Sequence, residues 1–531
     1  MTSMGGSGEG ESHAWSPEGC GVDGSLPDGE SGPATAEARV ERLLEELVEE
    51  VSSSNAKASS ASEVSCVREL LATGVDHAGV RQLAIRAASE GLWSLAVAAW
   101  SVCLEEPAHR RRWRTHTQFA VALRETGRVE EAREALLTAR QEFGPKVEIL
   151  RELARTHASE SDWDGLVHVW RAAKPGLPQN PSGGHLGSWV SPDEPLRIGL
   201  VIQGPMLSSG KTRHMALEAV TADDVVTLEC TDNVTRLIRE ASSVVEEAVC
   251  VTWDTEDTRE LRRQVGEEQV VQIRDTTRPL DPKSPLIPGN NKYRQFLSTL
   301  AGVEVVAARD CTAVIKVRTD QWVDVAVLSG YLRALHRAGL LEGRLVVPRF
   351  RTKRPAAIQD DFYFGGLAVT MRAACERYLH GPEFYEDVHQ DLFYKWAWTL
   401  SGEQSGAPRR AYFPKGEPSL PSQLKLARRM WHRLFTPFPR AAAVSLVWRG
   451  QGGRRMGKGE LFAEDGWPAI DRVFKDRYAV GSPNEMALLQ RLGAVSWRRV
   501  LAHGYRSATG REGRGKASFS VEFAHPTQST T

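Results

Sequence analysis

The sequence from residue 313 to residue 320 combines residue types that can bind a phosphate or a metal ion. It reads Ala-Val-Ile-Lys-Val-Arg-Thr-Asp and predicts a strand. Side chains alternate along a strand, so Lys316, Arg318 and Asp320 are expected on one face. Charged groups on a central strand are costly to bury unless they are paired. A terminal Asp can hold a hard divalent cation, which would neutralise a diphosphate leaving group. A structural ion pair between Arg318 and a carboxylate is the alternative.

A glycine-containing segment, QGPMLSSGKT at 203–212, follows an earlier predicted strand. It is close to a P-loop, whose four residues between the glycines let backbone N–H groups surround a phosphate. Here five residues separate the glycines, and Pro205 lacks an N–H. The preferred interpretation is a strand end that contacts a nucleotide base or ribose through Gln203, Gly204 and Pro205. The alternative is a P-loop nucleotide hydrolase or kinase that uses Lys211 and Thr212.

The segment NNKYRQFLSTLAGVEVV, residues 290–306, predicts a helix that opens after a Pro-Gly turn. Asn291, Arg294, Gln295 and Ser298 recur at helical spacing and therefore share one face. Such a face can form hydrogen bonds with a ligand. A solvated helix face is the alternative interpretation.

Two acidic segments follow. In the first, Asp360 and Asp361 precede an aromatic run and a glycine pair. Paired carboxylates suit metal binding or general-base work, whereas an acidic turn before a core strand is the plain alternative. The second holds four carboxylates and a His within nine residues, among them Glu386 and Asp387. One of these could deprotonate an acceptor hydroxyl, although acidic residues favour helix N-termini in any case.

The elements that must position these residues fall into two parts. From about residue 64 to residue 173 the sequence predicts helix pairs, with related segments beginning at Gly91, Gly127 and Ser161. A period near 34 residues resembles tetratricopeptide repeats, in which neighbouring pairs stack because one pair cannot bury its own apolar face. Two interpretations remain open: a docking surface for a protein partner, or a helical collar on the next domain.

After a Pro- and Gly-rich linker, short β-branched runs alternate with helical stretches. This pattern predicts an α/β domain with a mostly parallel sheet, whose ligands would bind beyond the carboxyl ends of the strands. The expected strands are 197–203, 224–230, 247–253, 268–274, 312–318 and 343–349.

The expected organisation has six segments. The stretch 422–449 mixes arginines with aromatic residues, so it is either an interfacial segment on a membrane or a solvated helix and loop. The segments are 1–35 (disordered), 36–173 (helical repeats), 174–194 (linker), 195–405 (α/β domain), 406–504 (C-terminal extension) and 505–531 (disordered tail).

Composition narrows the class of protein. The net charge is -1, so no charge excess favours nucleic acid. Seven scattered cysteines without a C-x-x-C pair argue against a disulfide scaffold or a zinc cluster and fit a reducing compartment. The N-terminus lacks a signal-peptide pattern, and no stretch reaches the ~20 apolar residues of a membrane span. A cytoplasmic protein is expected, and peripheral contact with the inner face of the membrane stays open.

Residues 196–400 resemble the WavE-like lipopolysaccharide-synthesis glycosyltransferases. The resemblance implies a GT-A-like, nucleotide-sugar-binding fold and transfer of a sugar from a nucleotide-sugar donor to a glycan acceptor. The Ala-, Arg-, Val- and Gly-rich composition is typical of high-GC bacteria, so a capsular, wall-linked or secreted polysaccharide is as good an acceptor as lipopolysaccharide. The matching motifs are Gly204-Pro205 after a strand, Asn291-x-x-Arg294-Gln295-x-x-Ser298-Thr299-x-x-Gly302, Lys316-x-Arg318-Thr319-Asp320, and Asp360-Asp361 before Gly365.

By this resemblance, Arg318-Thr319-Asp320 stands where GT-A enzymes carry a metal-binding Asp-x-Asp. Asp320 would bind Mn²⁺ or Mg²⁺, or face the donor's diphosphate, but Arg318 replaces the first acid and could itself neutralise the diphosphate. A non-catalytic scaffold whose repeats do the work is the rival outside the enzyme classes. The remaining roles are Gln203, Gly204 and Pro205 in the nucleotide pocket; Asn291, Arg294 and Gln295 on the donor; Asp360 or Asp361 as metal partner or base; Glu386 or Asp387 as alternative base; and Arg349, Arg351, Lys353 and Arg354 on the diphosphate or an anionic acceptor.

Overall fold

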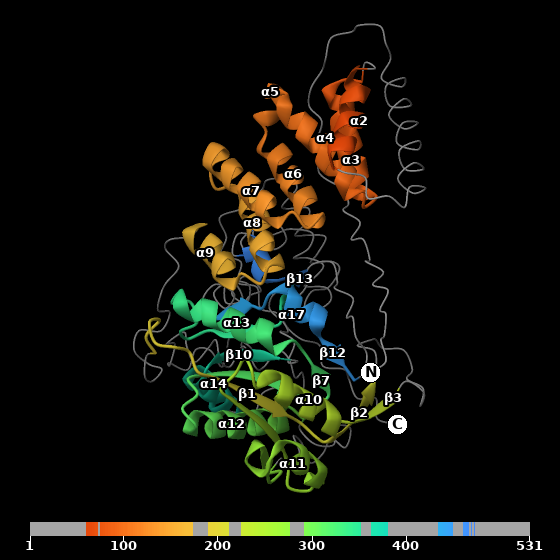
Figure 1. Cartoon of the computed structure of the whole chain (residues 1–531). Helices are drawn as coiled ribbons and strands as arrows, with labels where there is room; N and C mark the ends of the chain where they lie inside the picture. The colour runs from red at the N-terminus through yellow and green to blue at the C-terminus, as the bar shows by residue number, and fades with distance from the viewer. Residues whose placement is uncertain are drawn as a thin grey trace, which may run out of the picture. The chain divides into compact units, whose positions relative to one another are not determined.

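The computed structural model of the chain is drawn in Figure 1. It divides into two compact units, residues 1–160 and 161–531, which are described separately. The expected disordered segments 1–35 and 505–531, and most of the 174–194 linker, lie outside the described residues. The structure describes residues 60–72, 75–173, 190–211, 225–276, 291–351, 363–380, 434–449, 460–466, 469 and 472.

The described part of the first unit is helical, as predicted. Neighbouring helices pack in sequence, with α3 against α4, α4 against α6, α6 against α7 and α7 against α8. The helices are α2 (Ser60–Ala72), α3 (His77–Ser89), α4 (Trp93–Glu105), α5 (Pro107–Arg110), α6 (Trp113–Glu125), α7 (Val129–Phe143) and α8 (Val147–Ser159).

The three related sequence segments share one backbone turn. Gly91 and Gly127 have φ angles of 79° and 78°, and Ser161 has a φ of 58°. Each lies two residues before a helix, namely α4, α7 and α9 (Trp163–Ala173). Glycine enters this left-handed region without a steric penalty, so the repeated sequence marks a repeated helix start. α9 belongs to the second unit, where it packs against α13 (Val325–Arg337), although the sequence placed it with the repeats.

A sheet organises the second unit. The described strands form a seven-stranded sheet in the order β11-β8-β10-β6-β1-β4-β5. β10 runs antiparallel to both of its neighbours and the other paired strands run parallel. The predicted layout of an all-α part followed by an α/β part with a mostly parallel sheet is therefore confirmed. The strands are β1 (Ile198–Gln203), β4 (Glu247–Trp253), β5 (Val270–Ile273), β6 (Ala313–Arg318), β8 (Leu345–Val347), β10 (Phe364–Leu367) and β11 (Phe435–Pro437).

Two regions depart from the sequence-based expectation. The run 224–230 forms β3 (Val225–Glu229), which pairs antiparallel with β2 (Leu207–Lys211) outside the main sheet. β11 adds an edge strand from the segment expected to be an extension, and Phe435 and Phe438 are 0% exposed. These two rings are core residues and do not face a membrane.

Two further antiparallel strand pairs lie outside the main sheet. They are β7 (Gln321–Trp322) with β12 (Val447–Trp448) and β9 (Phe350–Arg351) with β13 (Glu460–Leu461).

Helices cover both faces of the main sheet. α12 and α14 pack together on one face, and α13 lies on the opposite side of β1 (Figure 1). α10 also contacts β4 and α13. The bounds are α10 (Thr231–Ala241), α11 (Arg259–Val265), α12 (Asn291–Ala308), α14 (Ala368–His380) and α17 (Arg440–Ser445), with 3₁₀ turns at Glu267–Gln269 and Ala463–Asp465.

Glycines allow α12 to lie close against β1. A Cβ on Gly302 would come within 2.3 Å of Val201 Cγ1, and one on Gly199 within 2.6 Å of Val306 Cβ. No real Cβ tolerates such contacts in a close-packed interior. The helix therefore approaches the strand by an amount that only glycine permits, and this approach sets the position of the polar residues in the first turns of α12.

We predict that Gly302→Val destabilises the protein by about 1–3 kcal/mol, because the new side chain must push α12 away from β1. Ala301→Val is the matched control, since it adds the same β-branched residue to the same helix at a half-buried position. Urea denaturation followed by tryptophan fluorescence measures both. Equal losses in the two variants would contradict the close-packing argument.

A buried carboxyl gives the second unit a pH dependence. Glu464 is 6% exposed, and its oxygens accept hydrogen bonds from the Arg440 backbone N–H at 2.9 and 3.2 Å. Burial raises its pKa to about 7, against an ordinary value of 4.5. The folded state thus holds the proton more tightly than the unfolded state, and stability falls as pH rises between these two values.

We predict that Glu464→Gln removes this dependence while keeping an acceptor for Arg440. Relative to the parent, the variant gains stability as pH rises from 4.5 to about 7 and keeps that gain above it. Glu304→Gln, at an exposed position of α12, is the control. The measurement is the free energy of unfolding at a series of pH values, and a parallel pH profile for parent and variant would refute the prediction.

Candidate functional site at the carboxyl ends of β1 and β6

The strand order reverses between β1 and β6. From β1 the chain continues to β4 and then β5 on one side, whereas β6 lies on the other side of β1. In open α/β sheets, ligands bind in the crevice beyond the carboxyl ends of the strands at such a switch point. Gln203 and Arg318, the last residues of β1 and β6, are paired in register at this edge.

The end of β1 is joined to α12. Gln203 is 4% exposed, and its side-chain oxygen accepts a hydrogen bond from Ser298 Oγ at 2.8 Å. The Ser298 hydroxyl also lies 2.8 Å from the Arg294 carbonyl oxygen. The predicted polar face of the helix therefore meets the end of the first strand.

The end of β1 is also joined to the end of β6. Gly204 has a φ of 140°, and a Cβ there would lie 2.6 Å from Thr319 Oγ1. The Thr319 hydroxyl donates to the Pro205 carbonyl at 2.8 Å, and its N–H donates to the Gln203 carbonyl at 3.1 Å. A glycine is needed at 204 because both the backbone angle and the close approach exclude a side chain.

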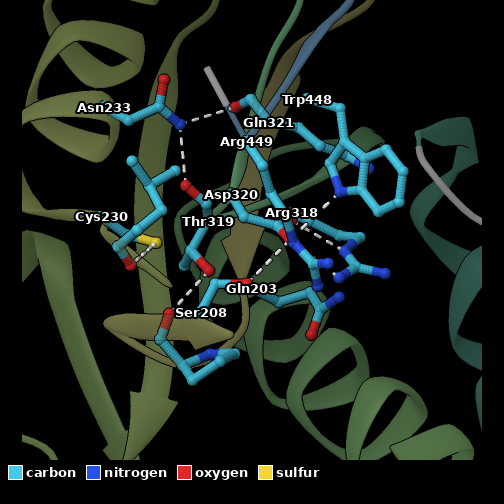
Figure 2. Close-up of polar contacts among 12 residues, drawn as sticks. Gln203, Ser208, Cys230, Asn233, Arg318, Thr319, Asp320, Gln321, Trp448 and Arg449 are labelled. Carbon is cyan, nitrogen blue, oxygen red and sulfur yellow. Dashed lines mark hydrogen bonds and ion pairs between the residues drawn. The ribbon is translucent and has the colours of Figure 1, made fainter. Parts of the chain in front are cut away.

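Asp320 is the centre of a buried polar cluster, which we call the Asp320 cluster (Ser208, Arg318, Asp320, Trp448 and Arg449; Figure 2). Its side chain is 1% exposed. Within the described residues the carboxylate accepts five hydrogen bonds: two from Arg318, both at 3.0 Å, and one each from Ser208 at 2.9 Å, Arg449 at 3.1 Å and Trp448 at 3.2 Å. The Asp320 carbonyl accepts a further bond from the Arg449 N–H at 2.9 Å.

The cluster keeps Asp320 ionised. Burial alone would raise the pKa of this carboxyl, but the charge of Arg318, its hydrogen bonds, the Ser208 hydroxyl and the charge of Arg449 outweigh burial and hold the pKa below its ordinary value of 3.8. Asn233 of α10 holds the turn between β6 and β7. Its side-chain amide donates to the Thr319 and Gln321 carbonyls at 2.7 and 2.8 Å.

These surroundings do not fit a divalent cation at Asp320. Four donors converge on Oδ2 of Asp320, and Arg318 Nε donates to Oδ1. Two guanidinium groups at hydrogen-bonding distance would repel a cation. In the described part of the chain no cluster of three or more His, Cys, Asp or Glu side chains is placed to bind a metal. The expected role of Asp320 as a metal ligand therefore has no support in its environment.

Other predicted residues lie near this edge or beneath it. Arg294 pairs with Asp275, with Nε 2.7 Å from Oδ2, and its guanidinium lies 6.0 Å from the ring centre of Trp253 at the end of β4. Gln295 is buried in α12. Lys316 is 0% exposed within the sheet, with Nζ 5.0 Å from the Phe364 ring centre, so it lies below the open edge.

The remaining candidates either lie away from this edge or fall outside the described residues. Lys211 does not follow the P-loop arrangement of loop and helix, because it ends β2, where it pairs with Val225. Arg349 is buried and donates to Glu460 at 2.7 Å. Outside the described residues, or with side chains outside them, lie Asn291, Arg351, Lys353, Arg354, Asp360, Asp361, Glu386, Asp387 and Thr212.

Sequence reasoning missed three members of the Asp320 cluster. Ser208 comes from β2, and Trp448 and Arg449 come from the end of the segment expected to be an extension. The available signal was the mixture of arginine and aromatic residues at 422–449. Its composition drew attention to the segment, but nothing local indicated its distant partner.

Comparison with protein-family models, with curated proteins and with solved structures finds no match for this chain. Among the described helices, none has the length and apolar character required to cross a bilayer.

We predict that Asp320→Asn lowers the free energy of unfolding by about 3 kcal/mol near neutral pH, because it leaves two arginines without their shared buried charge. The folded pKa is depressed, so this contribution is present above pH 3.8 and is lost as pH falls through the folded value. The difference between parent and variant should therefore shrink in acid.

Asp310→Asn is the control for this variant. Asp310 is exposed and has a φ of 64°, a conformation that asparagine tolerates well. Chemical denaturation at neutral and acid pH measures both variants. A stability of Asp320→Asn equal to that of the control at neutral pH would show that the cluster contributes no net stability.

Proposed function

We propose that this protein is a glycosyltransferase that moves a sugar from a nucleotide-sugar donor to a cell-surface or capsular polysaccharide acceptor. In this proposal the α/β part is a GT-A-like domain. Its mostly parallel sheet and the β1/β6 switch point are compatible with that layout. The helical part would dock a protein of the same pathway.

One observation carries the proposal. Three of the four motifs on which the WavE-like resemblance rests lie far apart in sequence, yet direct hydrogen bonds join them at a single sheet edge. Ser298 of the helical motif donates to Gln203, and Thr319 of the strand motif donates to Pro205. Because ligands bind at this edge of open α/β sheets, we assign these motifs to binding of the donor.

In the proposed transfer, negative charge develops on the diphosphate oxygen that leaves the sugar. An acceptor hydroxyl oxygen forms a bond to the anomeric carbon, the bond from that carbon to the diphosphate oxygen breaks, and the electron pair leaves with the diphosphate. The hydroxyl proton passes to a base, for which Asp360, Asp361, Glu386 and Asp387 remain the proposed candidates. Fixed positive groups near the leaving oxygen would stabilise the charge that it gains.

The two rival functions make different demands on the structure. A P-loop enzyme needs residues 207–212 to wrap a phosphate, whereas residues 207–211 form β2 in an antiparallel pair. A scaffold needs only its helical repeats and makes no use of the polar contacts at the sheet edge. The contacts around Gln203 and Thr319 therefore favour the transferase.

We predict that a nucleotide or nucleotide sugar raises the melting temperature of the full-length protein. A ligand that binds only the folded state adds about 2.7 kcal/mol at a concentration of about 100 times Kd. The panel is UDP, GDP, CDP, ATP, GTP and their common sugar conjugates, each with EDTA or with Mn²⁺. Arg294→Met should reduce the shift, because it removes a charge at this edge, whereas Arg263→Met should not, because Arg263 is exposed on α11.

Three results would overturn the proposal. A shift with ATP or GTP alone that is lost in Lys211→Ala would favour the P-loop enzyme. The absence of any shift would favour the scaffold. Binding without release of free nucleoside diphosphate when donor and glycan acceptors are supplied would argue against a transferase and for a nucleotide-binding module.

A further inference from the structure

Arginines gather where α5 meets α6 in the first unit. The sequence there is Arg110-Arg111-Arg112-Trp113-Arg114, which we call the basic corner. α5 ends at Arg110 and α6 begins at Trp113, so the four arginines lie on a short connection and on the two helix ends beside it. All four arginines are exposed, whereas Trp113 is half-buried. α5 packs against its chain neighbours α4 and α6 (Figure 1).

The positive charge of the basic corner has no matching carboxylate. Within the described residues, none of its four guanidinium groups forms an ion pair. The acids that precede the corner have other partners: Glu105 pairs with Arg68 at 2.6 Å, and Glu106 lies 3.6 Å from His77. Arginines elsewhere in this unit do pair with a glutamate, namely Arg68, Arg86, Arg124, Arg128, Arg133 and Arg155.

A buried histidine beside the basic corner responds to this charge. His109 of α5 is 8% exposed. Burial lowers its pKa most, and the charges of Arg112 and of Arg81 in α3 lower the pKa further, against the opposing charge of Glu106. The first turn of α6 contains no acidic residue, so the positive end of the helix dipole adds to the arginines. The positive potential therefore extends from the corner to α3.

An anionic lipid surface matches these features best. Guanidinium groups form charge-assisted hydrogen bonds with phosphate oxygens, and a cluster of about four or more basic residues is attracted to anionic lipids. Tryptophan is enriched at the membrane–water interface, and the Arg114 guanidinium lies 5.3 Å from the ring centre of Trp113. The net charge of the chain is -1, so it lacks the general basic charge that is typical of nucleic-acid-binding domains.

We infer that the basic corner binds the surface of a membrane that contains anionic lipids. Its four guanidinium groups pair with lipid phosphates, while Trp113 contacts the headgroup region. The site differs from the segment 422–449, to which the sequence attached a membrane contact, since Phe435 and Phe438 of that segment are core residues. This inference goes beyond the proposed function and does not rest on it, because it requires no particular reaction in the second unit.

The test is co-sedimentation of the full-length protein with vesicles of phosphatidylcholine, with or without phosphatidylglycerol. We expect binding to the vesicles that contain phosphatidylglycerol and none to the neutral vesicles. Binding should weaken as salt is added, because salt screens exposed charges. Binding that is equal for both vesicles, or that salt does not change, would contradict a charged contact. These arms use the parent protein alone and so do not depend on the folding of any variant.

The variants locate the contact. Arg111→Gln combined with Arg112→Gln should weaken binding to the phosphatidylglycerol vesicles at least about tenfold, since each arginine near the surface contributes about fivefold. Arg68→Gln combined with Arg128→Gln removes the same net charge from exposed, paired arginines of this unit and should bind like the parent. Equal losses in the two double variants would remove the basic corner from the contact.

A third pair separates lipid from other partners. Arg111→Lys combined with Arg112→Lys keeps the charge and should bind the vesicles within about twofold of the parent. A loss as large as that of the glutamine pair would show that charge at a lipid surface is not what the corner recognises. Tighter binding to a fluorescent DNA duplex than to the vesicles, through the same arginines, would assign the corner to nucleic acid instead. Nucleotide-induced shifts in melting temperature should be the same in all these variants, so failure here leaves the proposed function untouched.

Discussion

The arrangement of the candidate site depends on one buried carboxylate. Asp320 follows β6, and it receives hydrogen bonds from β2, from its own strand end and from the β12 segment. A carboxylate at 1% exposure is stable only because these donors replace water. The same bonds that satisfy the charge hold three distant parts of the chain at one edge of the sheet.

A second constraint acts from below the site. Gly199 and Gly302 let α12 approach β1 at a distance that excludes any side chain. This approach brings Ser298 to Gln203 and sets Arg294 beside Trp253. The polar contacts above and the close apolar contact below are therefore coupled: a change in the helix–strand distance would shift the polar face that the ligand is proposed to meet.

The sequence predicted the helices and strands well but did not predict which strands and side chains contact each other across the chain. All six β-branched runs are strands, and the polar residues of 290–306 do lie on a helix, because alternation and helical spacing are local properties. The run at 224–230 looks like the others but pairs with β2 in a hairpin, since periodicity does not encode which strand lies alongside. β11, Trp448 and Arg449 were not assigned to the sheet or the site, because their partners lie 90 to 129 positions earlier in the chain.

The contacts of Asp320 bear on how the Arg318-Thr319-Asp320 motif is interpreted. Read alone, Arg-Thr-Asp left a metal ligand and an arginine site equally open. The structure surrounds the Asp with donors and adds a second guanidinium held at a left-handed backbone angle. Two guanidinium groups from separate segments therefore share the carboxylate of Asp320, and this buried ion-pair network joins the end of β6 to the segment that carries Arg449. Under the proposed function, preorganised charge at this edge would stabilise the negative charge that develops on a leaving group.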